Sequence, residues 1–451
     1  MLSSDTSSRS SSFSSDSSFH SAEELLFEQA PPSFSGKNLV LCFDGTASRF
    51  GKRPSSNVLK LYQMISCDTS TQLHYYQPGI GTYIASDNDP DFFSSKLRSF
   101  FLAIDSIIAY SFDDHIIAGY RFLIRYYDPG DRIWMFGFSR GAFTARVLAS
   151  MVARIGLLGR GGEELVPCAW EIYQSWERHS SSSDPLCSVN RLADDFKDSF
   201  SCHSPLVHFL GLWDSIDSVG LFRNKVFPQA SRCDAVSHVR HALSIDERRS
   251  NFRQSSSSQS QGYWFPVEGE QENDLVERWF PGNHGDIGGG WPAESSDGGQ
   301  LADLSLRWMI HEAHLLGLPF SLNALCGLSM CSPVSALMAR AHDLLSFRRD
   351  QGKGKYSSVK WWTLELIPWP YKIGWQRKIF PNLGRRRKIP QDATLHWSVK
   401  WKRALDPRYR PRNIPAGAVY DASDELVCIP DEAVCVPDDM DDLAGNSEGS
   451  V

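Results

Sequence analysis

Short apolar runs alternate with longer helical stretches along most of the chain after residue 36. The run 38–43 ends at Asp44-Gly45-Thr46, a pattern typical of a buried strand that breaks into a turn. Further runs of strand length occupy 73–76, 132–136, 207–212 and 279–281. Apolar residues recur at helical spacing over 92–112, 120–127, 141–158 and 301–316. This alternation predicts an α/β fold, in which a doubly wound, mostly parallel sheet carries helices on both faces.

Changes in composition divide the chain into four predicted parts. Residues 1–36 form a Ser-rich tail that has too little apolar surface to order itself. Residues 37–320 contain the alternating elements, with helical insertions, and form the main domain. Residues 321–430 are rich in Trp and are predicted to be a C-terminal extension or cap, and residues 431–451 form an acidic disordered tail.

Composition and charge exclude several classes of protein. Of the 451 residues, 41% are hydrophobic and 22% are charged, which excludes wholesale disorder. The formal net charge is −7, which argues against binding to nucleic-acid backbones, because such binding needs basic surfaces. The ten cysteines are scattered without a Cys-x-x-Cys pair, which favours free thiols over a disulfide framework or a zinc module.

Targeting signals are not evident in the sequence. It contains no apolar run of about 18 residues, the length a spanning helix needs. It also lacks the basic start and apolar stretch of a secretory signal, so we expect a cytoplasmic protein. Peripheral membrane contact through the Trp-rich part and the basic cluster 385–388 is one hypothesis. A Trp-stabilised core with a solvated basic loop is the favoured interpretation of the same residues.

The strongest chemical signal is Gly137-Phe138-Ser139-Arg140-Gly141, which matches G-x-S-x-G. It lies between a predicted strand and a predicted helix, the context in which this motif presents a nucleophile on a sharp turn. Ser139 is therefore the candidate nucleophile, and the backbone N–H of Arg140 is a candidate oxyanion donor at the helix N-terminus. The alternative is an ordinary Gly-rich turn with an exposed serine.

A serine nucleophile needs a base, and the base needs an orienting carboxylate. Asp214 follows the run 207–212, and His284 lies in a Gly-rich loop after the run 279–281. The order Ser139, Asp214, His284 is that of α/β hydrolases. Other residues of the right type remain as alternatives: the acids Asp217 and Asp286, and the histidines His203, His208, His238 and His241.

A second oxyanion donor is expected from a loop that follows an early strand. The backbone N–H of Gly45 or of Thr46 is well placed for this, with Asp44 bracing the loop. An ordinary turn explains the same residues equally well.

Two other functions compete with a triad hydrolase. A Gly-x-Ser-x-Gly serine combined with Asp297-Gly298 is typical of patatin-like lipases, which use a Ser–Asp dyad, but the remaining motifs do not match that family. A catalytically inactive α/β-hydrolase-fold binding or scaffold module is the second alternative. Mixed charges over 240–249 predict either a buried ion network or a solvated helix, and Gly288-Gly289-Gly290 predicts a flexible turn or, less often, a phosphate cradle.

Taken together, these motifs resemble the DUF2235 family, which includes the catalytic domain of type VI secretion Tle1-like phospholipase effectors. The resemblance spans roughly residues 37 to 320 and is carried by several stretches in the right order. They are 43–46, 57–58, 76–82, 137–142, 213–214, 240–249, 279–290 and 301–309.

The resemblance implies an α/β-hydrolase fold that cleaves ester bonds, in some members those of phospholipids. Carried over to this sequence, Ser139 is the nucleophile, Asp214 the orienting acid and His284 the base. An acyl ester or phospholipid is then the substrate, and no metal or cofactor is needed. Two departures are Ala47-Ser48 after the Asp-Gly-Thr signature and Asp217 close to Asp214, which keeps Asp217 as a rival acid.

Overall fold

The computed structural model describes most of the chain between residues 34 and 421. The described residues are 34–46, 48, 50–51, 54–66, 68–79, 97–179, 188–216, 227, 236–252, 274–292, 299–321, 323, 333–347, 355–366, 369–373, 376–380 and 382–421. The first 33 residues of the predicted N-terminal tail and the whole predicted acidic tail lie outside these ranges.

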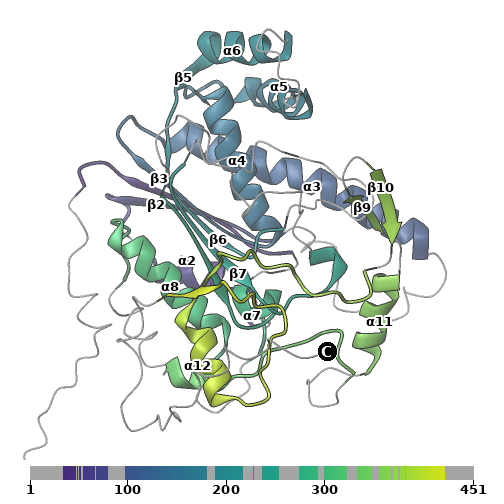
Figure 1. The fold of residues 1–451 in the computed structure, drawn as a ribbon. Helices are drawn as coiled ribbons and strands as arrows, with labels where there is room; N and C mark the ends of the chain where they lie inside the picture. Colours follow the sequence, from purple (N-terminus) through teal and green to yellow (C-terminus); the bar gives the residue numbers. More distant parts are fainter. Residues whose placement is uncertain are drawn as a thin grey trace, which may run out of the picture.

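An eight-stranded sheet forms the centre of the molecule (Figure 1). Its strand order is β12-β11-β8-β7-β6-β3-β1-β2, and every neighbouring pair is parallel. The strands are β1 (Asn38–Phe43), β2 (Gln72–Gln77), β3 (Arg132–Phe138), β6 (Val207–Trp213), β7 (Val236–Ser244), β8 (Asp274–Phe280), β11 (Thr394–Leu395) and β12 (Val419–Tyr420). The prediction of an α/β fold with a mostly parallel sheet is confirmed.

Helices cover both faces of this sheet. They are α2 (Asn57–Met64), α3 (Leu97–Tyr126), α4 (Arg140–Ile155), α5 (Val166–His179), α6 (Ser188–Phe200), α7 (His284–Gly288), α8 (Ala302–Leu315), α10 (Pro333–Met338), α11 (Lys355–Leu366) and α12 (Trp397–Leu405). Figure 1 shows α3 and α4 on one face, with α5 and α6 beyond them, and α2, α8 and α12 on the other. Among these described helices, none is long and apolar enough to cross a bilayer.

The remaining elements are short. β4 (Leu157–Leu158) pairs antiparallel with β5 (Ser201–His203), and β9 (Trp369–Ile373) pairs antiparallel with β10 (Gln376–Phe380). Within the described residues there are also two 3₁₀ turns, η1 (Glu163–Leu165) and η3 (Ser250–Phe252).

The side chains of the central strands divide between two hydrophobic cores. In β1, Leu39 and Leu41 face the core beneath α3 and α4, whereas Val40 and Cys42 face the core beneath α2 and α8. Successive strand residues point to opposite faces, and both faces are covered here. This double burial is why β1 reads in the sequence as a continuous apolar run and not as an alternating one.

Most predicted elements agree with the structure to within a few residues, but others differ. The predicted strand 279–281 overlaps only the last two residues of β8. The described parts of the helical stretches predicted over 92–112 and 120–127 fall in one helix, α3, which spans Leu97–Tyr126, and residues 92–96 lie outside the described residues. The mixed-charge run 240–249 is not a solvated helix, because its first half completes strand β7. Its arginines form separate ion pairs, in which Arg240 pairs with Asp274 and Glu312, Arg248 with Asp343, and Arg249 with Glu247. The pair Arg249–Glu247 is buried as predicted, whereas the side chains of Asp274 and Asp343 are 43% and 37% exposed.

Part of the predicted C-terminal extension continues the main sheet. Leu395 of β11 pairs with Trp279 of β8, and β12 then pairs with β11. A third small core joins Trp279 and Leu243 to Leu395 and Val399. The segment 382–421 is therefore packed onto the edge of the sheet, next to the ends of β7 and β8. The predicted domain boundary at residue 320 and a role as a cap stay predictions.

Candidate active site

Ser139 lies at the sharp turn between β3 and α4. Its backbone has φ 60° and ψ −122°, in a region that non-glycine residues rarely occupy. A Cβ atom at Gly141 would overlap the carbonyl oxygen of Phe43 at the end of β1, so only glycine lets the chain pass there. The G-x-S-x-G pattern therefore has a steric reason. It places Ser139 at the C-terminal edge of the sheet and at the N-terminus of α4.

Asp214 follows β6, the next strand in the sheet, and is also at positive φ, 43°. Its side chain is fully buried. The carboxylate accepts hydrogen bonds from the backbone N–H of Ser244 to Oδ1, at 3.0 Å, and from the Ser244 hydroxyl to Oδ2, at 3.1 Å. A buried carboxylate is stable only when its oxygens are paired in this way.

His284 begins helix α7. Asn283 caps this helix: its Oδ1 accepts from the backbone N–H of Gly285 and of Asp286, and Asp286 Oδ2 accepts from the backbone N–H of Asn283. This capping box fixes the start of the helix and therefore the position of His284. The Nδ1 atom of His284 lies 2.6 Å from Oδ2 of Asp214.

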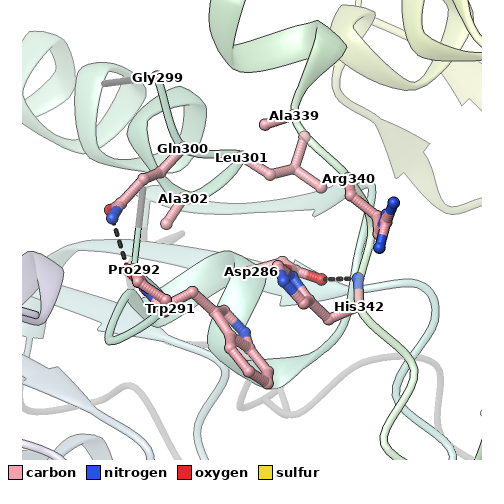
Figure 2. Close-up of a pocket in the computed structure, with 10 residues that line it drawn as sticks. All are labelled: Asp286, Trp291, Pro292, Gly299, Gln300, Leu301, Ala302, Ala339, Arg340 and His342. Atoms are coloured by element: carbon pink, nitrogen blue, oxygen red, sulfur yellow. Dashed lines mark hydrogen bonds and ion pairs between the residues drawn. The ribbon is translucent and has the colours of Figure 1, made fainter. Parts of the chain in front are cut away.

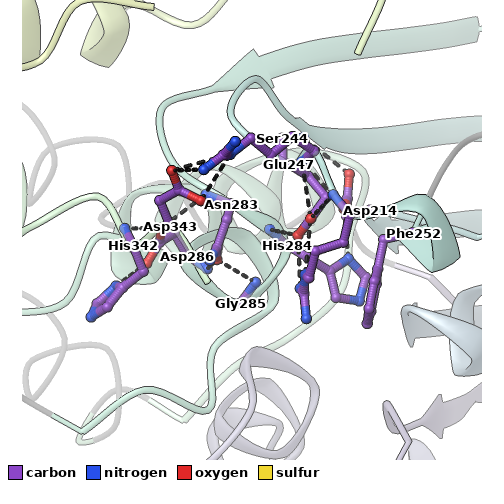
Figure 3. Close-up of polar contacts among 12 residues, drawn as sticks. Asp214, Ser244, Glu247, Phe252, Asn283, His284, Gly285, Asp286, His342 and Asp343 are labelled. Carbon is purple, nitrogen blue, oxygen red and sulfur yellow. Dashed lines mark hydrogen bonds and ion pairs between the residues drawn. The ribbon is translucent and has the colours of Figure 1, made fainter. Parts of the chain in front are cut away.

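Aromatic rings hold the imidazole of His284 in place. The ring centroid of Phe138, the residue before Ser139, lies 4.6 Å from the centroid of the imidazole, and that of Phe252 lies 4.7 Å from it. The backbone N–H of Ser139 donates to the carbonyl of Trp213, the residue before Asp214, at 3.0 Å. These contacts place Ser139, Asp214 and His284 at the same edge of the sheet, and their catalytic roles stay predictions (Figure 3 shows Asp214, His284 and Phe252).

The pKa values of Asp214 and His284 both lie below their ordinary values, for different reasons. Burial raises the pKa of the Asp214 carboxyl, but the Arg387 guanidinium and His284 outweigh it and hold that pKa well below its usual range. Burial lowers the pKa of His284, and the neighbouring Asp214 opposes this only in part. The pair is therefore an ionised carboxylate beside a neutral imidazole at neutral pH. Such an imidazole is able to accept a proton.

The loop after β1 lies beside the turn between β3 and α4 that carries Ser139, as expected for a loop that supplies an oxyanion donor. A Cβ at Gly45 would come within 2.6 Å of the Phe138 ring. The Gly45 N–H, however, donates to the carboxylate of Asp44 at 2.6 Å, and the Tyr76 hydroxyl donates to the same carboxylate at 2.7 Å. Asp44 thus braces the loop as predicted. The hydroxyl of Thr46 is buried and makes no hydrogen bond within the described part of the chain.

The rival acids have different outcomes. Asp217 lies outside the described residues. Asp286 is committed elsewhere: its carboxylate accepts from the backbone N–H of His342 at 2.8 Å and lies 2.6 Å from that residue's Nδ1. His342 also stacks on Trp291, and these three residues form part of the wall of a small pocket (Figure 2). Asp297 and Gly298 of the dyad alternative lie outside the described residues.

The other candidate histidines have partners away from Ser139. His208 contacts the carbonyl of Leu316, His238 pairs with Asp274, and the ring of His203 packs on Tyr127. His241 lies nearer the site, because its Nε2 accepts from the backbone N–H of Ser215 and its Nδ1 faces Glu277.

The glycine run after His284 has a packing role. A Cβ at Gly288 would overlap the ring of Phe138, and a Cβ at Gly289 would lie 2.9 Å from the backbone nitrogen of Asn57. Gly290 donates its N–H to the carbonyl of Ser55. These contacts hold α7 close to the turn that carries Ser139.

Several residues of the site were missed in the sequence. Ser244, Phe252 and Arg387 contact Asp214 or His284, and Glu247 accepts the backbone N–H of His284 at 3.2 Å. Arg387 belongs to the basic cluster predicted as a solvated loop. Its side chain is only 3% exposed, whereas the neighbouring Arg385 and Arg386 are exposed. No local pattern in the sequence distinguishes Arg387 from these neighbours.

The described residues hold no cluster of His, Cys, Asp or Glu arranged for a metal ion.

The sequence matches the family model described as T6SS phospholipase effector Tle1-like, catalytic domain, over residues 37–312. It is 32% identical to the uncharacterized protein YEL023C of Saccharomyces cerevisiae, over 85% of this chain and 81% of that protein. The match to the yeast protein extends well beyond the part covered by the family model.

Two solved structures are similar to this chain at lower sequence identity than the yeast protein. One is an uncharacterized protein from Pseudomonas aeruginosa, with 18% identity and a TM-score of 0.36, covering 70% of this chain and 50% of that one. The other is the Tle1 effector bound to the VgrG spike from the type 6 secretion system, with 19% identity and a TM-score of 0.30, covering 59% of this chain and 53% of that one. The chain therefore spans about half the length of each. Because the family model matches more than half of its residues, this chain belongs to the family of Tle1-like phospholipase-effector catalytic domains.

Proposed function

We propose that the protein is a serine hydrolase that cleaves carboxylic ester bonds of phospholipids or related lipids through an acyl-enzyme. The observation that carries the proposal is the 2.6 Å contact between His284 Nδ1 and Asp214 Oδ2, beside a serine at φ 60° on a strand-to-helix turn. Membership of a phospholipase-effector family supports the choice of lipid esters.

The reaction begins with the proton of the Ser139 hydroxyl. Nε2 of His284 removes it while Oγ attacks the carbonyl carbon of the ester and forms a tetrahedral oxyanion. Asp214 keeps the Nδ1–H tautomer and stabilises the imidazolium. The imidazolium then gives its proton to the leaving alcohol oxygen as the C–O bond breaks. Water, deprotonated by His284, attacks the acyl-serine, and the imidazolium then returns the proton to Oγ as the acyl C–Oγ bond breaks, which releases the fatty acid and free Ser139.

Two donors are proposed for the oxyanion. The first is the backbone N–H of Arg140, at the N-terminus of α4. The second is Thr46, through its N–H or its buried hydroxyl, since the Gly45 N–H already donates to Asp44. A buried hydroxyl without a partner costs free energy, and an oxyanion would satisfy it.

The test is labelling by a fluorophosphonate probe, followed by mass spectrometry of products from mixed phospholipid vesicles. We expect the wild type to be labelled at Ser139 and to release fatty acid and lysophospholipid, and Ser139→Ala to do neither. His284→Ala separates the mechanisms, because a Ser–Asp dyad enzyme would keep its activity. A folded wild type that is neither labelled nor active, with or without lipid, would overturn the proposal and favour the scaffold alternative.

A further inference from the structure

Arg387 connects the C-terminal part of the chain to the proposed catalytic group. Its guanidinium donates from Nη1 to Asp214 Oδ1 at 2.5 Å and from Nη2 to Asp214 Oδ2 at 3.0 Å. The two parallel bonds form the bidentate geometry in which arginine holds a carboxylate most firmly. Oδ2 is the oxygen that also faces His284, so Arg387 and His284 share one acceptor atom.

The same guanidinium reaches the residues around the imidazole. Nη2 donates to the carbonyl of Phe252 at 2.7 Å, and the Phe252 ring packs on His284. Arg387 is itself held from outside, because Asn413 Nδ2 donates to the Arg387 carbonyl at 3.1 Å and to the Ile245 carbonyl at 2.9 Å. The arginine is thus built into the site and is not a surface cation that happens to lie near it.

We propose that Arg387 is a positioning residue of the Ser139–Asp214–His284 group, which fixes both carboxylate oxygens of Asp214 and offsets part of the negative charge that Asp214 presents to His284. This inference rests on the proposed function and extends it to a part of the chain beyond residues 37–312, which the family model covers. The C-terminal segment then completes the catalytic site in addition to extending the sheet.

A positive charge so close to Asp214 affects the basicity of His284. The charged groups around the imidazole are Asp214 after β6, Glu247 and Arg249 after β7, and Arg387 from the C-terminal segment. Asp214 and Glu247 favour the imidazolium, whereas Arg249 disfavours it. Removing the charge of Arg387 leaves Asp214 unbalanced, so the imidazolium gains stability and the pKa of His284 rises.

The test compares Arg387→Gln and Arg387→Lys with the wild type, with Arg385→Gln as a matched control at an exposed position of the same basic cluster. The rate of fluorophosphonate labelling is measured across pH, and the low-field proton resonance of the His284 Nδ1–H is titrated by NMR. For Arg387→Gln we expect the midpoint of the acid limb to move up by about one pH unit. For Arg387→Lys, which keeps the charge but loses the planar fork, we expect an unmoved midpoint and a rate about tenfold lower. Arg385→Gln should match the wild type.

A folded Arg387→Gln protein with the wild-type midpoint and rate overturns the inference. If Arg387→Gln does not fold, Arg387→Lys decides, and a wild-type labelling rate in that variant also overturns it. Failure of the proposed function gives a different result, because the wild type is then not labelled. The NMR titration still reports the effect of Arg387 on His284 in that case.

Discussion

Nδ1 of His284 lies 2.6 Å from Oδ2 of Asp214, although 70 residues separate them in the sequence. The parallel sheet produces this contact. Asp214 follows β6, and His284 follows β8, two strands away in the same sheet. Parallel strands end at the same edge, so the turns that follow them meet there.

Replacing Asp214 with Asn should abolish most of the activity without changing the backbone. Asparagine tolerates the positive φ at this position, so the turn is preserved. Its amide no longer selects the Nδ1–H tautomer or stabilises an imidazolium, and we expect a loss of about 10⁴-fold in the labelling rate. A labelling rate within tenfold of the wild type would show that another carboxylate orients His284.

The same substitution should lower stability, because it leaves Arg387 buried without its counter-charge. Breaking a buried ion pair from one side costs about 3–5 kcal/mol. Adding Arg387→Gln to Asp214→Asn removes the unpaired charge. We therefore expect the double variant to recover part of the free energy of unfolding but none of the activity. Chemical denaturation of the three proteins measures this, and a double variant less stable than Asp214→Asn would contradict it.

The activity should fall at acid pH with a midpoint below the ordinary histidine value. Burial lowers the pKa of His284 from 6.5, while Asp214 stays ionised to a much lower pH. The imidazole must be neutral to accept the Ser139 proton, so activity is full above its pKa and is lost as the pH falls through it. A labelling-rate profile measures the midpoint. A value above 7 would mean that the charge of Asp214 outweighs burial.

The sequence predicted β1, β3 and β6 well because these strands are buried on both faces. Continuous apolar runs such as 38–43 and 132–136 leave few other interpretations. Strand β7 was missed because it contains Arg240 and His241, which are polar in the sequence but paired or packed within the fold. Charge alone does not tell a buried, paired arginine from a solvated one.

The same limit applies to the candidate site. Ser139, Asp214 and His284 could be predicted as candidates because a strand-to-helix motif and the order of the residues single them out. Arg387 lies 173 residues after Asp214, and only the tertiary fold brings the two together. Its three basic neighbours in the sequence gave no local sign that this one residue would be buried.

Replacing Gly288 with Ala should reduce activity by displacing the ring of Phe138, the residue before Ser139. The added methyl group would overlap the Phe138 ring, which packs on the imidazole of His284. The ring must shift to make room, and small displacements of a catalytic base cost about 10²-fold in rate. We expect that loss in labelling, together with a lower melting temperature. Wild-type labelling would mean that Phe138 does not fix the position of His284.

Replacing Glu247 with Gln should lower the free energy of unfolding and change how that free energy depends on pH. Glu247 is buried, pairs with Arg249 at 2.7 Å and accepts the backbone N–H of His284. Burial raises its pKa, but Arg249 outweighs this and lowers the pKa from 4.5 to about 2.

The lowered pKa of Glu247 determines how its contribution to stability changes with pH. The ionised form of Glu247 is favoured in the folded state, so its contribution to stability is present above pH 4.5 and is lost as the pH falls through about 2. Glu247→Gln removes that contribution, at a cost of about 3 kcal/mol near neutral pH. The difference in unfolding free energy between the two proteins should therefore shrink between pH 4.5 and pH 2. Denaturation curves across that range provide the measurement, and a difference that stays constant would assign the stabilisation to packing of Arg249 between Phe252 and Trp361 instead.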